Sequence, residues 1–232
     1  MRLVDHPSPN HGPRADGVSV SILLVHYTGM KTGQAALDRL CDPAAQVSTH
    51  YVIDEDGTVY RLVDENRRAW HAGKGTWQGQ DDINSRSVGI ELVNPGHRYG
   101  YRPFPQIQVE AFRTLGREVM ARHGIPPAGV LGHSDIAPLR KEDPGELFPW
   151  EALSREGIGI WPDPDFRPGS SGPVTPAQAC AWLRQVGYSV DETILEPVLK
   201  AFRRHYHPEG LAAEAAAETL RRLQALAAGK FL

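Results

Sequence analysis

Three side chains of types that bind metals lie near the ends of apolar segments of this sequence or in the loops after them. His26 falls within the apolar run Ser21–Tyr27, near its end, and His133 follows the short run Val130–Gly132. Asp143 lies ten residues after His133. Two histidines and one carboxylate with an open fourth position form the ligand pattern of a catalytic zinc. His26 and His133 are 107 residues apart, so the spacing alone is weak evidence and only the fold can join them.

A carboxylate interrupts a further apolar segment, because Glu91 lies within Val88–Val93. Burying a carboxylate costs free energy unless the group is paired or functional. One interpretation is an outward-facing strand residue or a structural ion pair. The other is a general base with a raised pKa, beside a water that a metal activates. The sequence pattern leaves both open.

The elements that must position these residues alternate between strands and helices. Apolar, β-rich runs predict strands, and apolar residues at helical spacing predict helices. Asp56-Gly57 is a tight-turn signal, so the strands on either side form a hairpin and the sheet is partly antiparallel. We expect an irregular lead-in over residues 1–19, and an α/β fold with a mixed central sheet flanked by helices. The predicted strands are 21–27, 49–53, 58–63, 87–93 and 130–133, and the predicted helices are 32–40 and 106–123.

A stretch rich in proline and glycine, Trp161–Pro173, indicates a linker between two domains. Beyond it the pattern is helical throughout. Thr175-Pro176 is a cap followed by proline at the first helical position. We therefore predict a small three-helix bundle, with helices over 175–187, 197–206 and 211–228. The predicted division is a catalytic domain 1–162, a linker 163–173 and a helical domain 174–232.

Composition excludes several classes of protein. The formal net charge is 25 − 28 = −3, without a basic stripe, which argues against a nucleic-acid partner. Apolar runs are too short to span a membrane, and the polar, proline-containing start does not read as a signal peptide. We expect a cytoplasmic protein, or a periplasmic one if a signal preceded this sequence.

Cys41 and Cys180 are far apart, and each is expected to be a plain buried thiol.

Six motifs occur in an order that resembles a known family. Together they are similar to the zinc-dependent N-acetylmuramoyl-L-alanine amidases of the AmpD/AmiD type, which share their fold with peptidoglycan recognition proteins. The resemblance covers roughly residues 20–155, and the helical tail loosely resembles a peptidoglycan-binding module. The motifs are His26–Thr28, Ser48–Gly57, Trp70–Gly73, Asn84–Glu91, Gly132–Pro138 and Lys141–Gly145.

The resemblance implies a site and a reaction. His26, His133 and Asp143 match the ligands of one Zn²⁺ per chain. Glu91 matches the catalytic acid/base, and Lys141 matches the lysine that stabilises the tetrahedral oxyanion. The implied reaction is hydrolysis of the amide that joins the lactyl group of N-acetylmuramic acid to L-Ala. The expected partners are soluble peptidoglycan fragments, above all anhydro-muropeptides in cell-wall recycling.

The substrate-binding residues that the resemblance implies are less specific. His71 is either a substrate contact or a hydrogen-bond partner of a metal ligand. Trp77, in the glycine-rich loop 73–79, is a candidate wall of the groove. The expected set is Tyr27, Trp70, His71, Asn84 and Arg86.

Two alternatives to this function stay open: a non-catalytic peptidoglycan recognition module, or an amidase acting on intact cell wall. The sequence also leaves the oligomeric state open, together with the preference between anhydro- and ordinary muramic acid.

Overall fold

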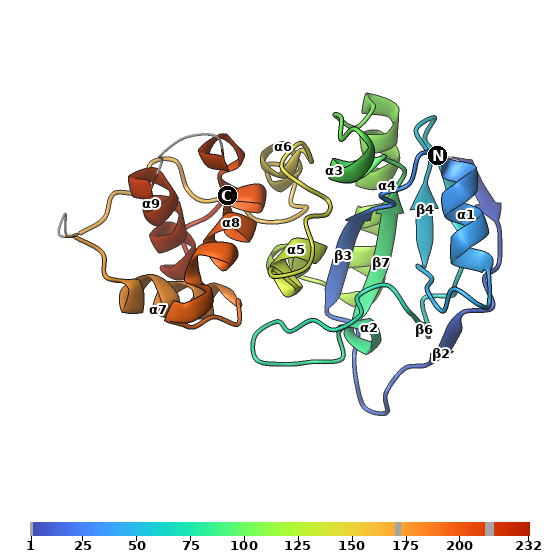
Figure 1. The fold of residues 1–232 in the computed structure, drawn as a ribbon, viewed down its shortest axis with the longest axis horizontal. Coiled ribbons are helices and arrows are strands. Elements are labelled where there is room, and N and C mark those ends of the chain that lie inside the picture. The colour runs from blue at the N-terminus through green and yellow to red at the C-terminus, as the bar shows by residue number, and fades with distance from the viewer. Residues whose placement is uncertain (1, 170–172, 212–215) are drawn as a thin grey trace.

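The computed structural model describes residues 2–169, 173–211 and 216–232 (Figure 1). A six-stranded sheet of order β1-β5-β4-β7-β3-β8 forms its centre, and a two-stranded ribbon pairs β2 with β6. The mixed central sheet flanked by helices confirms the predicted fold class. The strands are β1 (Arg2–Asp5), β2 (His11–Pro13), β3 (Ile22–Tyr27), β4 (Tyr51–Ile53), β5 (Thr58–Arg61), β6 (Arg67–Ala69), β7 (Ser87–Leu92) and β8 (Val130–Gly132).

Helices lie on both faces of the sheet and fill the C-terminal part. Short 3-10 turns stand at Pro127–Gly129, Glu192–Ile194 and Pro208–Leu211. The α-helices are α1 (Gly33–Cys41), α2 (Ile83–Arg86), α3 (Gly96–Tyr99), α4 (Gln106–His123), α5 (His133–Ile136), α6 (Trp150–Ser154), α7 (Pro176–Val186), α8 (Leu195–Tyr206) and α9 (Ala216–Ala227).

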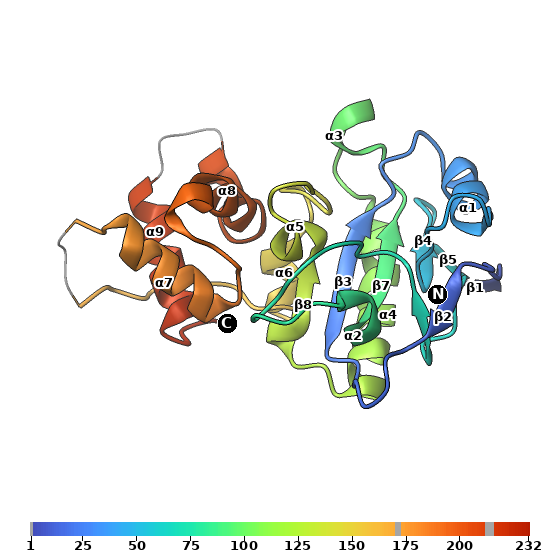
Figure 2. The ribbon, with the colours of Figure 1, turned by 60° about the horizontal axis from the view of Figure 1, so that its bottom comes forward.

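Two hydrophobic clusters hold the helices against opposite faces of the sheet. Along β4, Tyr51 and Ile53 belong to the cluster that also contains Phe112 and Leu115 of α4, whereas Val52 belongs to another. That second cluster includes Leu37 and Leu40 of α1. Successive strand residues point to opposite faces, so the alternation along β4 is what a sheet covered on both sides requires. Figure 2 shows α4 behind the strands.

The register of the parallel strands brings chemistry-bearing residues to one edge. β3 runs parallel to both β7 and β8, with His26 opposite Glu91 and Val25 opposite Gly132. His133 directly follows β8 as the first residue of α5. The carboxyl ends of parallel strands share one edge, which is where open α/β sheets place their ligands. This topology joins residues that are far apart in the sequence.

The N-terminal prediction was wrong. Residues 1–19 were expected to be irregular, but β1 pairs with β5 at the edge of the main sheet and β2 pairs with β6. Both strands are short, and neither has the long β-rich run from which strands are predicted. The hairpin around Asp56-Gly57 is confirmed, with β4 antiparallel to β5 and Gly57 at a φ of 81°. Its positive φ explains the preference for glycine in the turn.

The three predicted C-terminal helices are present as α7, α8 and α9. Thr175 caps α7 reciprocally with Gln178, and Pro176 is its first residue, as the sequence indicates. Pro197 lies in the first turn of α8, where its missing N–H breaks no helical bond. The predicted start of the third helix was 211; Leu211 ends a 3-10 turn, and 212–215 lie outside the described residues.

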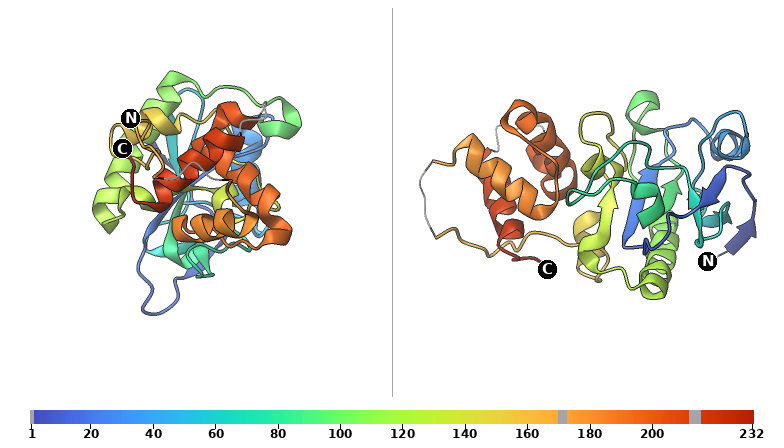
Figure 3. Two further views of the ribbon diagram at one scale, coloured as in Figure 1. Left: turned by 90° about the vertical axis from the view of Figure 1, so that its left-hand side faces the viewer. Right: turned by 90° about the horizontal axis from the view of Figure 1, so that it is seen from below.

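The bundle packs on the sheet domain through α5 and α6, which stand between them in Figure 1 and in the second view of Figure 3. One hydrophobic cluster runs through both parts, from Leu23 of β3 to Phe202 of α8. Cys180 is buried and Cys41 is half-buried, and both are free thiols. Across the described ranges, no helix has the length and apolar character needed to cross a membrane.

Candidate metal centre

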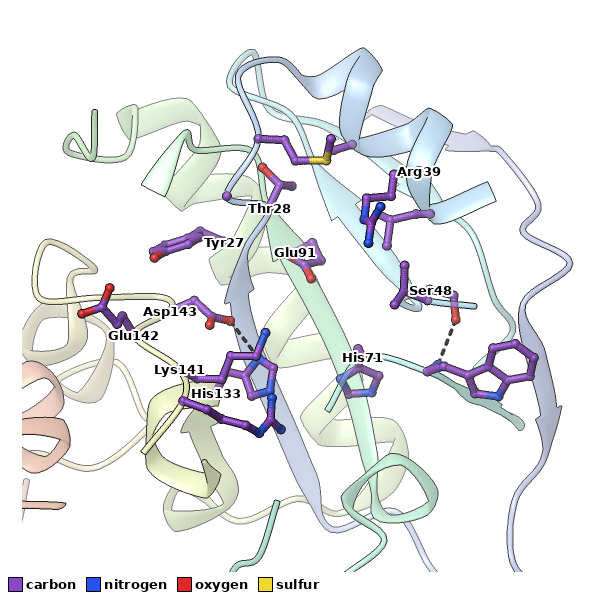
Figure 4. A pocket seen from close by; sticks show the side chains of 17 residues that line it. Tyr27, Thr28, Arg39, Ser48, His71, Glu91, His133, Lys141, Glu142 and Asp143 are labelled. Atoms are coloured by element: carbon purple, nitrogen blue, oxygen red, sulfur yellow. Dashed lines mark hydrogen bonds and ion pairs between the residues drawn. The ribbon is translucent and has the colours of Figure 1, made fainter. Parts of the chain in front are cut away.

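Three potential ligands from separate segments meet at the carboxyl edge of the sheet, and Figure 4 shows two of them, His133 and Asp143. Nδ1 of His26 lies 2.9 Å from Nδ1 of His133 and 2.9 Å from Oδ2 of Asp143. Nδ1 of His133 lies 3.0 Å from the same carboxylate oxygen. All three residues are buried. Among the described residues they are the one group of three or more such side chains placed to hold a metal ion.

Hydrogen bonds on the far side of His26 set the tautomer of its ring. The hydroxyl of Ser87 donates to the carbonyl of Ile83 at 2.6 Å, so its oxygen is left to accept from Nε2 of His71 at 3.3 Å. The Nδ1 of His71 then carries a lone pair and accepts from Nε2 of His26 at 3.0 Å. By this network, Nδ1 of His26 has no proton and offers a lone pair to the centre.

The ring of His133 is fixed in the same way by a backbone carbonyl. Its Nε2 lies 2.9 Å from the carbonyl oxygen of Ala72 and must donate to it, which leaves the Nδ1 lone pair facing Asp143. Two imidazole lone pairs and one carboxylate oxygen thus converge with no donor between them. Acceptors crowded in this way repel one another unless a cation lies among them, and this donor set suits zinc.

The electrostatics of two of the buried ligands, His26 and Asp143, agree with this arrangement. Burial, reinforced by the neighbouring His133, lowers the pKa of His26 to about 4. Burial alone would raise the pKa of Asp143, but the neighbouring His133, and after it His26, outweigh burial and hold that pKa far below its usual value. A neutral imidazole at His26 beside an ionised carboxylate at Asp143 is the pair of protonation states that a metal ion binds.

Glu91 enters the same cavity from β7 (Figure 4), and the strand register places it opposite His26. Its Oε2 is buried and has no hydrogen-bond partner among the described residues. Burial, and then the negative charge of Asp143, raise the pKa of Glu91 well above its ordinary value, while Lys141 partly opposes this. Glu91 lines the cavity, and within the ranges that the structure describes it forms no ion pair, so neither form of the first interpretation holds. A free carboxyl with a raised pKa beside a metal centre can take up and release a proton.

The cavity at this edge has a volume of about 370 Å³. Of the sequence-predicted residues, His133, Asp143, Glu91 and Lys141 line it. So do three of the five predicted substrate contacts, which are Tyr27, Trp70 and His71. The cavity therefore joins two of the three potential metal ligands, a proton carrier and a cation in one space. His26 is not a lining residue, but its Nδ1 lies 2.9 Å from both of these ligands.

Asn84 and Arg86 are not among the residues that line the cavity. Asn84 is buried, and its Oδ1 accepts the backbone N–H groups of His71 at 3.0 Å and Ala72 at 2.8 Å. It thereby holds the segment that carries His71. Arg86 has a buried Nη1 with no partner in the described ranges. Their assignment as substrate contacts stays a prediction.

Two further aromatic residues, His50 and Trp77, are buried in contacts with other parts of the fold. His50 is buried, and its Nδ1 accepts the N–H of Gly89 at 2.9 Å, while its Nε2 lies 3.1 Å from Arg14 and from the carbonyl of Arg67. Trp77, a candidate wall of the groove, is buried against Tyr188 with ring centroids 5.0 Å apart, and the cavity lining does not include it.

Sequence reasoning missed several residues that build the site. Arg39 and Ser48 line the cavity, and Ser87 and Asp135 support the ligands. Ser87 begins a predicted strand, and Asp135 lies in the Gly132–Pro138 motif, so the sequence analysis includes both positions without assigning them a role. Their roles depend on partners distant in sequence, which no local pattern indicates.

Two histidines, one carboxylate and a neighbouring free carboxyl define the site of a metal-dependent hydrolase. Residues 16–146, more than half of the chain, match the model of the N-acetylmuramoyl-L-alanine amidase family. The chain belongs to this family.

Similar proteins bear this out over nearly the whole length. The N-acetylmuramoyl-L-alanine amidase AmiD of Escherichia coli is 37% identical over 222 residues, which cover 86% of this chain and 79% of that protein. A solved complex of the E. coli protein with its substrate anhydro-N-acetylmuramic acid-L-Ala-D-γ-Glu-L-Lys has a TM-score of 0.78 at 36% identity, covering 92% of this chain and 91% of that one. AmpDh3 of Pseudomonas aeruginosa, solved with an anhydromuramic pentapeptide, has a TM-score of 0.77 at 29% identity, covering 91% and 93%.

Proposed function

We propose that this chain is a zinc-dependent amidase that cleaves the bond between the lactyl group of N-acetylmuramic acid and L-Ala in peptidoglycan fragments. The observation that carries the proposal is the convergence of His26, His133 and Asp143 at the cavity that Glu91, His133 and Asp143 line. The similar E. coli enzyme binds an anhydro-muramyl peptide as its substrate. We therefore take anhydro-muropeptides, the fragments of cell-wall recycling, as the substrates of this chain.

One zinc ion per chain, held by His26, His133 and Asp143, would supply Lewis-acid polarisation of the scissile amide and acidify the attacking water. Glu91 takes the proton of that water, since its carboxyl lies in the cavity without another partner. Its raised pKa lets the carboxyl keep this proton until the C–N bond breaks. Glu91 then delivers it to the departing amine of L-Ala, so one residue is base and acid in turn.

Lys141 supplies positive charge at the same cavity. As the water adds, the amide oxygen becomes an oxyanion, and a fixed ammonium group stabilises the transition state more than the ground state. Tyr27, Trp70 and His71 form walls against which the sugar and peptide can be held. Both ring nitrogens of His71 already form hydrogen bonds, to His26 and to Ser87. Its further contribution is therefore to orient the metal ligand His26.

Mass spectrometry of a mixed set of anhydro- and ordinary muropeptides tests the function. We expect intact peptides that begin with L-Ala to be released, the release to stop with a chelator and to return with zinc. Faster cleavage of the anhydro sugar supports the recycling substrate, and cleavage of whole sacculi favours action on intact wall. Tight binding without release under any metal condition would identify a recognition module instead.

The domain division 1–162, 163–173 and 174–232 and the cytoplasmic location stay predictions. Sedimentation of the chain with purified sacculi, in the presence of a chelator, tests whether the helical domain binds peptidoglycan. Fractionation of the source cells tests the location.

A further inference from the structure

The short helix α5 carries a buried carboxylate two residues after the metal ligand His133. Asp135 is 1% exposed and has three donors. Its Oδ2 accepts the backbone N–H of Gly132 at 2.7 Å and Nδ1 of His205 at 2.7 Å. Its Oδ1 accepts the hydroxyl of Tyr188 at 2.5 Å. Two of these three donors come from the C-terminal bundle.

The bundle also contacts the loop that carries Lys141 and Asp143. Arg204 of α8 bonds Oε1 of Glu142 at 2.5 Å, and Glu142 stands between Lys141 and Asp143. The N–H of Ser134 donates to the carbonyl of Asp143 at 2.9 Å, so the two ligand-bearing segments are tied to each other as well. These five contacts thus tie the His133 turn, the Asp143 loop and the C-terminal bundle to one another.

Packing makes this network rigid. The ring of His205 is stacked between Trp150, at 3.7 Å between centroids, and Tyr206, at 3.8 Å. Tyr188 is fully buried against Trp77, and the N–H of Gln78 donates to the carbonyl of Gly187 at 2.8 Å. Side chains that are buried and stacked in this way have little freedom to let the carboxylate move.

We propose that the C-terminal bundle positions the metal centre, with Tyr188, His205 and Arg204 as positioning residues that fix His133 and Asp143 through Asp135 and Glu142. The bundle is then a structural part of the catalytic unit, whatever it binds elsewhere. Outer groups that orient metal ligands typically change metal affinity by about 10- to 100-fold. These residues act one step further out, so we expect the lower end of that range. The inference rests on the metal site of the proposed function.

Tyr188→Phe tests the inference in the full chain, because it removes the hydroxyl that bonds Asp135 and keeps the ring. The zinc dissociation constant, measured by competition with a chromogenic chelator, should rise about tenfold. On soluble muropeptides kcat should fall with little change in KM. Tyr206→Phe is the matched control: Tyr206 is as deeply buried in the same bundle, but no described hydrogen bond joins it to Asp135. Its zinc affinity should equal that of the wild type.

Arg204→Met tests the second contact independently, since methionine keeps the packing of the stem and removes the ion pair with Glu142. It should weaken zinc binding severalfold. Folding of each variant is checked by circular dichroism. Folded variants whose zinc affinity matches the wild type would overturn the inference, even if their melting temperatures fell. A wild-type chain that binds no zinc would instead overturn the proposed function.

Discussion

Nε2 of His26 lies 3.0 Å from Nδ1 of His71, and this bond begins a chain that passes through Ser87 and ends at the carbonyl of Ile83. These hydrogen bonds all donate in the same direction, from His26 toward Ile83, because a carbonyl oxygen can only accept. His71 therefore keeps the Nδ1 of His26 free of a proton, on the side that faces Asp143. Of the two roles that the sequence left open for His71, the structure shows the contact with a potential metal ligand.

Two replacements of His71 should distinguish the effect of its hydrogen-bond acceptor on zinc affinity from the effect of its size. We expect His71→Leu to weaken zinc binding by about 10- to 100-fold, because Nε2–H of His26 loses its acceptor in a buried place. His71→Asn can present its amide oxygen near the former Nδ1 and should recover most of the affinity. Chelator competition measures both. Equal affinities in the two variants would show that bulk, not the hydrogen bond, is what matters.

Glu91→Gln should abolish turnover and keep the metal. The amide is nearly the same size as the carboxyl but cannot take a proton from water, and loss of a general base typically costs about 10²–10⁴ in rate. Glu91 is not in the ligand set, so bound zinc, measured by atomic absorption, should remain at one per chain. Turnover by Glu91→Gln or Glu91→Ala at the wild-type rate refutes the role of Glu91.

Lys141→Met should lower kcat by about 10²–10³, because the oxyanion loses a fixed positive charge. KM should change less, since the interaction develops in the transition state. Lys74→Met is a control with the same change in net charge, because Lys74 is exposed and does not line the cavity. Steady-state kinetics on one soluble muropeptide compare the two. Equal losses in both variants would point to a general charge effect.

The sequence predicted the strands that carry the candidate site, because β3 and β7 are long apolar runs and Gln106–His123 has a clear helical period. It could not predict β1 and β2, whose residues are largely exposed or half-exposed and whose partners are distant. Local pattern could raise His26, His133 and Asp143 as candidates, since each is a ligand type beside a strand or loop. The contact of Tyr188 with Asp135 joins residues 53 apart and leaves no periodic trace.

A carboxylate far from the cavity should make stability depend on acid pH. Glu65 accepts from Tyr51 and Arg122 at 2.6 Å and lies 2.5 Å from Nε2 of His123. Burial alone would raise the pKa of Glu65, but its bonds to Arg122, Tyr51 and His123 lower it from 4.5 to about 2. The folded state thus favours the ionised carboxylate more than the unfolded state does.

The stabilisation from Glu65 should therefore be complete above about pH 4.5 and should disappear as the pH falls toward 2. Glu65→Gln should lower the free energy of unfolding at pH 7 by about 1–2 kcal/mol, a value reduced for partial exposure. It should have little effect near pH 2. Glu118→Gln is the control, because Glu118 pairs with the same Arg122 at 3.6 Å but is half exposed. Urea unfolding at several pH values measures both, and a Glu65→Gln deficit that does not shrink in acid contradicts the linkage.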